Sequence, residues 1–261
     1  TGLTDQSGYT YTIGYSGNYI ASITDDNSGI SIRYGYDGDK LVSFTDVMGC
    51  VSTFEYDSNG KLCTIKNNDG YTVEALTYIT EEGSNKNKVL TKTDRAGNTV
   101  TYNYDTDSRC TTMTDSNGRV TKQYYDSCYN ITKTIDPEGG IETVSYFLND
   151  KGQSTMGEIR SKTDRNGNTT TNTIDDRGNI TKITYPDGSA KQYIYDSKNN
   201  VTYETNQAGR KIFYVYDSTG TYLQKVAVPV NTTANYSGDN TNFAVTEYTY
   251  YSDGTYGAKG L

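Results

Sequence analysis

Carboxylates are the side chains of this sequence that first suggest chemistry, because several occur in close pairs. The pairs are Asp25-Asp26, Asp37 with Asp39, Asp105 with Asp107, and Asp175-Asp176. A Ca²⁺ site or the acid–base pair of a glycosidase needs such carboxylates to converge in space. Most of these residues fall at turns that recur along the chain, which favours capping of the turn backbone. No EF-hand loop, phosphate loop or GxGxxG motif accompanies them.

The composition restricts other catalytic and binding chemistry. There is no histidine, which excludes Ser-His and Cys-His nucleophiles and removes the commonest zinc ligand. The cysteines, Cys50, Cys63, Cys110 and Cys128, show no CxxC spacing. The excess of 32 acidic over 24 basic residues argues against binding of a phosphate backbone. A Ser-Lys pair is compatible with this composition, but no motif supports one. We therefore expect no catalytic residue, metal site, cofactor, nucleic-acid partner or membrane insertion.

Tyrosine is the other residue that invites a functional interpretation, because flat rings at a fixed spacing can bind sugars. The chain has 27 tyrosines among 261 residues, whereas leucine, isoleucine, valine and phenylalanine together contribute 43. With so few aliphatic side chains the tyrosines are needed to bury surface, and the absence of tryptophan weakens the carbohydrate interpretation. Tyrosine and threonine favour strands, so the composition predicts an all-β fold rather than a disordered chain.

A turn of the form Asp/Asn-x-x-Gly, called the glycine turn here, recurs along the chain and must position these side chains. Its glycines are Gly8, Gly29, Gly49, Gly70, Gly97, Gly118, Gly139, Gly167, Gly188 and Gly209. The intervals are 20 or 21 residues, except for two of 27 and 28, and only Tyr185 replaces the Asp or Asn. In such a turn the carboxylate caps backbone N–H groups and the glycine adopts a positive φ. The period predicts about ten units of strand, turn, strand, turn.

A tyrosine follows most glycine turns after seven residues, and a second turn, called the tyrosine turn here, comes next. These tyrosines are Tyr15, Tyr36, Tyr56, Tyr104, Tyr125, Tyr146, Tyr195 and Tyr216, with Ile174 as one substitute and Tyr78 one place late. In a three-residue hairpin with a bulge, the residue before the turn pairs with the residue six places later. The predicted partners are Val42, Leu62, Cys110, Ile131, Ile180, Val201 and Tyr222. Cys110 is accordingly interpreted as a small buried hydrophobe rather than a reactive thiol.

The tyrosine turns share a short motif. It reads Tyr34-Gly35-Tyr36-Asp37, Phe54-Glu55-Tyr56-Asp57, Tyr102-Asn103-Tyr104-Asp105, Tyr193-Ile194-Tyr195-Asp196 and Tyr214-Val215-Tyr216-Asp217. With the glycine turns at 94–98 and 164–168, it resembles the YD-repeat, or RHS-repeat, family over roughly residues 5–226. The signature residues, to which the resemblance assigns a structural role, are Tyr36, Asp37, Tyr56, Asp57, Gly97, Tyr104, Asp105, Gly118, Tyr125, Asp126, Gly139, Gly167, Gly188, Tyr195, Asp196, Gly209, Tyr216 and Asp217.

The resemblance implies an all-β fold, an elongated and twisted antiparallel sheet of stacked β-hairpins that forms an open segment of a shell or strip. In bacterial toxin complexes and in teneurins such strips spiral into hollow shells, and in the toxins the shell encloses an effector that is released by self-cleavage. The acidic and arginine-containing motifs of that cleavage do not occur after residue 226. The segment Asp136-Pro137-Glu138-Gly139 is similar to part of them, but it lies in register with the other glycine turns and is interpreted as one.

The predicted organisation is an array of about ten repeats over residues 1–230, followed by a polar loop and a degenerate terminal repeat over residues 231–261. Longer turns are expected near 79–88 and 149–158, where polar residues absorb the longer intervals. The terminal repeat is expected to alternate over residues 243–251 and to turn at Asp253-Gly254. The sequence begins at Thr1 without a signal peptide, so we expect a mature fragment or an excised segment of a longer chain.

Two functions follow as expectations. The first is a non-enzymatic structural module, a segment of a shell or stalk of a large exported bacterial surface or toxin-related protein, secreted or at the cell surface. Its partners would be neighbouring repeats of the same polypeptide, and unpaired sheet edges would permit self-association. The alternative is a cell-surface adhesion or carbohydrate-binding module that holds glycans with exposed tyrosines and the loop at 231–242.

Overall fold

The computed structural model describes residues 2–5, 8–230 and 233–250 of the chain, with only the backbone for residues 154–156. These residues form strands and turns, and no helix occurs among them. The strands in the described ranges are β1 (Gly2–Thr4), β2 (Thr10–Ser16), β3 (Tyr19–Asp25), β4 (Ser31–Asp37), β5 (Lys40–Thr45), β6 (Val51–Tyr56), β7 (Leu62–Lys66), β8 (Thr72–Tyr78), β9 (Val89–Asp94), β10 (Thr99–Asp105), β11 (Cys110–Thr114), β12 (Val120–Tyr125), β13 (Ile131–Ile135), β14 (Ile141–Leu148), β15 (Ser154–Thr163), β16 (Thr169–Ile174), β17 (Ile180–Thr184), β18 (Ala190–Tyr195), β19 (Val201–Thr205), β20 (Lys211–Tyr216), β21 (Leu223–Pro229) and β22 (Phe243–Glu247).

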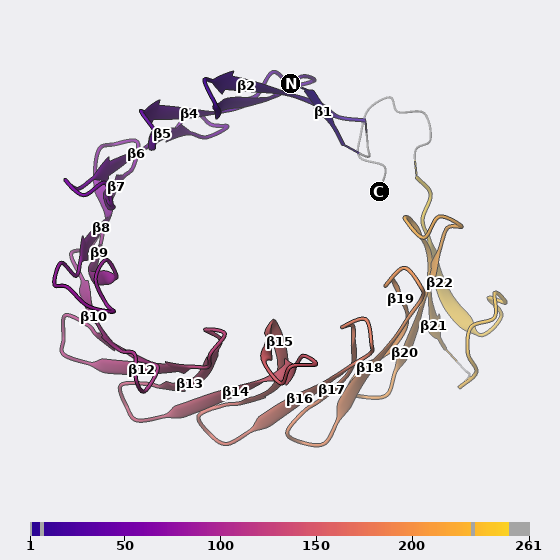
Figure 1. The fold of residues 1–261 in the computed structure, drawn as a ribbon. Helices are drawn as coiled ribbons and strands as arrows, with labels where there is room; N and C mark the ends of the chain where they lie inside the picture. The colour runs from indigo at the N-terminus through magenta and orange to yellow at the C-terminus, as the bar shows by residue number, and fades with distance from the viewer. Residues whose placement is uncertain (1, 6–7, 231–232, 251–261) are drawn as a thin grey trace. The chain divides into compact units, whose positions relative to one another are not determined.

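The chain divides into two compact units, Thr1–Lys122 and Gln123–Leu261. The boundary between them falls within β12. In the first unit, consecutive strands from β1 to β11 pair with one another, always antiparallel. In the second unit, β13 to β22 do the same (Figure 1). Each unit is thus a strip of antiparallel hairpins, which confirms the predicted all-β hairpin array.

The glycine turns form because one aspartate satisfies several turn N–H groups. In the turn at Gly97, the Gly97 N–H donates to the Asp94 carbonyl oxygen at 3.0 Å, and the Asp94 N–H donates to the Asn98 carbonyl oxygen at 3.0 Å. Asp94 Oδ1 accepts hydrogen bonds from the N–H groups of Ala96 at 2.8 Å and Asn98 at 2.9 Å. The φ of Gly97 is 85°, a left-handed conformation that glycine adopts without a Cβ penalty. The other signature glycines, Gly118, Gly139, Gly167, Gly188 and Gly209, have φ values of 76°, 85°, 85°, 80° and 75°.

Two glycine turns depart from the pattern. At Gly29 the capping residue is Asp25 rather than the expected Asp26: Asp25 Oδ1 accepts from the Asn27 N–H at 2.9 Å, and the Gly29 N–H donates to the Asp25 carbonyl oxygen at 2.8 Å. At Gly188 the backbone turn is closed by the Tyr185 carbonyl oxygen at 2.9 Å without a capping carboxylate at the first position. The backbone geometry therefore tolerates loss of the first-position carboxylate.

The predicted cross-strand partner is confirmed in three tyrosine turns. Tyr56 pairs with Leu62, Ile174 with Ile180 and Tyr195 with Val201, each beside a β-bulge. The partner of Tyr125 stays a prediction.

The predicted partner is wrong in the other three turns, because their lengths differ from three residues. Tyr36 pairs with Leu41, since Asp37 pairs with Lys40 across a two-residue turn. Tyr104 pairs with Thr111 and Tyr216 with Leu223, and both turns contain additional residues. Cys110 pairs with Asp105 rather than with the tyrosine, yet it is only 6% exposed, which confirms its burial. The four cysteines are free thiols.

The longer turns lie close to their predicted positions. The first connects β8 to β9 over residues 79–88. The second occupies residues 149–153, because β15 begins at Ser154 and extends the hairpin with β14 through register shifts. The loop from residue 233 to residue 242 precedes β22, which pairs with β21. The expected turn at Asp253-Gly254 lies outside the described residues.

The second unit contains a small aromatic core. Phe213 is 8% exposed and Ala227 is fully buried, and these residues face each other across β20 and β21. The Phe213 ring centroid lies 5.0 Å from that of Tyr203, 6.1 Å from that of Phe243 and 6.5 Å from that of Tyr236. Tyr236 belongs to the loop that was expected to be a polar binding loop. In the structure this loop covers buried aromatic surface.

Candidate functional site

Seven tyrosines, six of them at tyrosine turns and the seventh after β22, join their hairpin to the preceding one through a hydrogen bond, and we call this contact the tyrosine clasp. In each clasp the tyrosine hydroxyl donates to a backbone carbonyl oxygen. The bonds are Tyr36 to Ile20 (3.1 Å), Tyr56 to Leu41 (2.8 Å), Tyr78 to Leu62 (2.6 Å), Tyr104 to Val89 (2.8 Å), Tyr146 to Ile131 (2.8 Å), Tyr195 to Ile180 (2.8 Å) and Tyr250 to Leu223 (2.7 Å). For Tyr125 and Tyr216 the described residues show no such bond.

In five of the seven clasps the acceptor is the residue that pairs with the tyrosine of the preceding hairpin, and in a sixth, that of Tyr195, the acceptor Ile180 pairs with Ile174. Leu41 pairs with Tyr36 and accepts from Tyr56, and Leu62 pairs with Tyr56 and accepts from Tyr78. The clasps therefore form a chain of contacts along the strip. This arrangement was missed by reasoning from the sequence, which placed the rings on a buried face without a partner for their hydroxyl groups.

In five of the seven clasps, the residue immediately before the acceptor covers the ring of the clasp tyrosine. The Lys40, Lys61 and Lys88 ammonium groups lie 5.4, 5.0 and 4.9 Å from the ring centroids of Tyr56, Tyr78 and Tyr104, at cation–π distance. Where this residue is aromatic, the rings stack: the centroids of Tyr19 and Tyr36 are 4.9 Å apart, and so are those of Tyr222 and Tyr250. In the sequence, this ring contact could have been recognised from the lysine or tyrosine that directly precedes the apolar acceptor residue.

In three later repeats an asparagine stands at the position directly before the predicted partner residue. The Nδ2 groups of Asn179 and Asn200 donate to the capping carboxylates Asp175 and Asp196 at 3.1 Å, and that of Asn130 donates to Asp126 at 3.3 Å. Asn200 also donates to the Gly220 carbonyl oxygen at 2.8 Å, in the next tyrosine turn. Each of these asparagines begins an Asn-x-Thr sequence, and its hydrogen bond to the capping carboxylate of its own turn explains why asparagine stands there.

Burial raises the pKa of several tyrosines, four of them in clasps. Desolvation is the largest cause for the clasp tyrosines Tyr78, Tyr104, Tyr146 and Tyr195 and for Tyr216, which forms no clasp. For Tyr214, burial together with the charge of Glu204 raises the pKa to about 12. The phenol groups remain protonated donors at neutral pH, as the hydrogen bonds to carbonyl oxygens require.

The aspartates of the tyrosine turns act on the backbone of their own turns. Asp57, Asp105, Asp126 and Asp196 each accept hydrogen bonds from the N–H group two residues later, at 2.8–3.0 Å. Asp217 Oδ1 accepts from the N–H groups of Thr221 at 2.8 Å and Tyr222 at 3.1 Å. Asp37 differs, because it pairs with Lys40 as the last residue of its strand.

Hydrogen bonds lower the pKa of three of these carboxylates, those of Asp105, Asp196 and Asp217. The Ser108 hydroxyl lowers the pKa of Asp105, and the backbone N–H of Asn200 lowers that of Asp196. For Asp217 the Thr219 hydroxyl and then the Tyr222 N–H lower the pKa to about 2. None of the described residues forms a group of three or more potential metal ligands.

We expect the stability of the repeat to fall in acid because of these carboxylates. A group whose pKa is lower in the folded state stabilises the fold above its unfolded pKa of about 3.8 and loses that contribution as the pH falls. For Asp217 the loss occurs between about pH 4 and pH 2. Asp217→Asn keeps the oxygen acceptor but does not titrate, so its urea midpoint should fall less between pH 6 and pH 2.5. The measurement is circular dichroism during urea unfolding.

Asp176→Asn is the control, because that exposed carboxylate accepts no hydrogen bond from the described residues. Equal acid sensitivity of the two variants would contradict the expectation.

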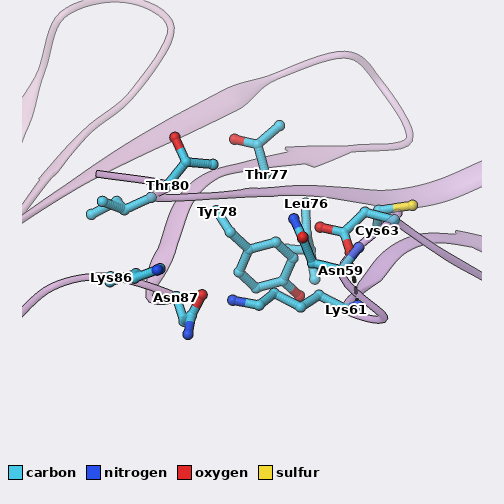
Figure 2. A pocket seen from close by; sticks show the side chains of 11 residues that line it. Asn59, Lys61, Cys63, Leu76, Thr77, Tyr78, Thr80, Lys86 and Asn87 are labelled. Atoms are coloured by element: carbon cyan, nitrogen blue, oxygen red, sulfur yellow. Dashed lines mark hydrogen bonds between the residues drawn. The ribbon is translucent and has the colours of Figure 1, made fainter. Parts of the chain in front are cut away.

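A polar pocket lies beside one clasp in the first unit. Its volume is about 660 Å³, and its walls are the tyrosine turn after β6 and the long loop between β8 and β9 (Figure 2). The lining residues are Asp57, Asn59, Lys61, Cys63, Leu76, Thr77, Tyr78, Ile79, Thr80, Lys86 and Asn87.

Parts of the chain match a known repeat family. A profile of the RHS Repeat family matches residues 85–120, 104–141 and 175–211, stretches that include glycine turns and the clasp tyrosines Tyr104 and Tyr195. These stretches of the chain are RHS repeats. No curated protein matches the sequence of this RHS-repeat chain. Within the described residues, no helix is long and apolar enough to cross a membrane.

Solved structures share the fold of the RHS-repeat chain. The crystal structure of TcdB2-TccC3-Cdc42 is 12% identical to it, with a TM-score of 0.53 over 97% of this chain and 17% of that one. A mutant Tc holotoxin pore of Photorhabdus luminescens is 13% identical, with a TM-score of 0.57 over 96% of this chain and 16% of that one. At these identities the similarity concerns the fold, and the RHS-repeat chain spans about a sixth of the proteins it matches.

Proposed function

We propose that the chain is a non-enzymatic structural segment of the shell or stalk of a large exported, toxin-related bacterial protein, at the cell surface or secreted. The observation that carries the proposal is the tyrosine clasp. Every clasp uses a side chain to fix one hairpin to the next, and the signature tyrosines Tyr36, Tyr56, Tyr104 and Tyr195 serve this purpose. The partners of the segment are then the neighbouring repeats of the same polypeptide, and its free sheet edges are the sites where further strands, or a second copy, would add.

The contacts of the tyrosines also favour this function over glycan binding by exposed rings. The hydroxyl groups of the clasp tyrosines already donate to carbonyl oxygens, and lysine or tyrosine side chains cover several rings. Tyr236, in the loop expected to bind glycans, packs against Phe243 and Phe213. Other side chains of the protein already contact these rings, which leaves them unavailable for stacking on a sugar.

Electron cryo-microscopy of the full-length natural protein tests the proposal. The expected result is that these residues form part of a continuous wall or stalk, flanked on both sides by further hairpins of the same polypeptide. A separate domain that carries no hairpins on either edge would overturn it, as would a substrate turned over by this segment.

A further inference from the structure

The polar pocket is built by an insertion that the repeat itself does not need. The interval between Gly70 and Gly97 is 27 residues instead of 21, and the additional residues form the loop 79–88. The loop is closed by backbone bonds, from the Ile79 N–H to the Lys88 carbonyl oxygen and from the Asn87 N–H to the Ile79 carbonyl oxygen, both at 2.9 Å. Asn85 Nδ2 anchors it to the next hairpin by donating to the Tyr104 carbonyl oxygen at 2.8 Å. The wall of the pocket is therefore fixed before any ligand arrives.

Several side chains in the pocket have polar groups without a protein partner. Among the described residues, the side chains of Asn59, Thr80 and Asn87 make no hydrogen bond to another protein group, although all three line the pocket. Asp57 Oδ1 accepts from the backbone N–H groups of Asn59 at 2.9 Å and Lys61 at 2.8 Å, so the turn is satisfied without the Asn59 amide. A pocket with convergent, unused amide and hydroxyl groups is suited to a ligand with many hydroxyl groups.

Two ammonium groups give the pocket a positive character in an acidic chain of net charge −8. Lys61 extends past the Tyr78 ring toward the loop in the view of Figure 2, with its Nζ 5.0 Å from the ring centroid. Lys86 contributes the second cation; its ion pair with Glu82 is exposed, and such pairs hold a lysine only weakly. The lining contains one carboxylate, Asp57, whose Oδ1 is already used by the turn. The pocket is therefore matched to an anionic ligand.

We infer that this pocket binds an acidic oligosaccharide, a short chain of uronic-acid units. The amide and hydroxyl groups would hold sugar hydroxyls, Lys61 and Lys86 would hold the carboxylates, and Leu76 would provide an apolar surface for sugar C–H groups. A volume of about 660 Å³ is far larger than inorganic phosphate requires. A nucleotide base would need a free ring face for stacking, and Lys61 covers the Tyr78 ring. This site differs from the exposed tyrosines, and the inference does not depend on the proposed function.

Isothermal titration calorimetry with trigalacturonate tests the inference, with neutral galactotriose and inorganic sulfate as the comparison ligands. The wild-type chain should bind trigalacturonate measurably and the other two at least tenfold more weakly. Lys61→Met and Asn87→Gly should each weaken binding at least tenfold. Glycine suits position 87 because the φ of Asn87 is 74°, so this variant removes the amide without adding backbone strain.

Lys40→Met is the matched control. Lys40 covers Tyr56 as Lys61 covers Tyr78, but it does not line the pocket. Its substitution should lower stability like Lys61→Met while leaving the affinity within twofold of the wild type. No heat of binding with trigalacturonate at millimolar concentration would overturn the inference. Equal binding of galactotriose or of sulfate would overturn it as well, and so would equal effects of the Lys40 and Lys61 variants on affinity.

Discussion

Replacing Phe213 with alanine should reduce the free energy of unfolding of the second unit by about 3–5 kcal/mol, the usual cost of deleting a buried aromatic side chain. Phe213 is one of three residues in the described part of the chain that are less than 9% exposed, and it contacts rings from β19, from β22 and from the loop. In a strip of half-buried hairpins few other side chains can compensate for its loss.

The loss should be largest at the C-terminal end of the second unit. Urea unfolding followed by circular dichroism measures the total change, and hydrogen exchange at the Val230 amide reports on the loop. The Val230 N–H donates to the Asn242 carbonyl oxygen at 2.9 Å, so its exchange should accelerate when the loop no longer has Phe213 to cover.

Tyr236→Ala is the comparison for Phe213→Ala. Tyr236 lies on the loop and covers the core from outside, so its removal should accelerate exchange at Val230 but cost clearly less stability. If Phe213→Ala cost less than about 1 kcal/mol, the aromatic cluster would not be a core, and the loop would be free to serve another purpose.

The repeat was predictable from the sequence because its determinants are local. A glycine in a left-handed conformation, such as Gly97, and an aspartate that caps the N–H groups of its own turn act within five residues. The spacing of these glycines and aspartates alone therefore predicted where the turns lie, and strands were predicted between the turns. Turn length was less predictable: Tyr36 and Tyr216 differ from the expected pairing by one residue, since the same Tyr-Asp motif precedes turns of different lengths.

The clasps, the aromatic core and the pocket were not predictable in the same way, because each joins residues from different hairpins. The acceptor of the Tyr104 hydroxyl is a backbone carbonyl 15 residues earlier, and backbone carbonyls carry no signal in the sequence. Tyr236 lies in a polar segment whose composition indicated an exposed loop, yet it packs on Phe213. The pocket depends on the loop 79–88, which appeared in the sequence only as a longer interval.

Replacing Tyr104 with alanine should remove a complete clasp and lower the free energy of unfolding of the first unit by about 2–4 kcal/mol. Three contacts are lost: the hydrogen bond to the Val89 carbonyl oxygen at 2.8 Å, the Lys88 ammonium group 4.9 Å from the ring centroid, and the Tyr102 ring with its centroid at 6.4 Å. Because the bond joins the β10–β11 hairpin to the hairpin before it, hydrogen exchange should accelerate on both sides of the break.

Tyr104→Phe separates the hydroxyl from the ring. It keeps the apolar contacts but leaves the Val89 carbonyl oxygen without its clasp donor, so it should cost about 0.5–1.5 kcal/mol. Tyr216→Phe is the matched control, since Tyr216 occupies the same position in its repeat and its hydroxyl has no hydrogen-bond partner among the described residues. Urea unfolding of both variants measures the two stability costs. A cost for Tyr104→Phe no larger than that for Tyr216→Phe would mean that the rings alone hold the hairpins together. A larger cost would establish the hydroxyl–carbonyl bond as the element that links one repeat to the next.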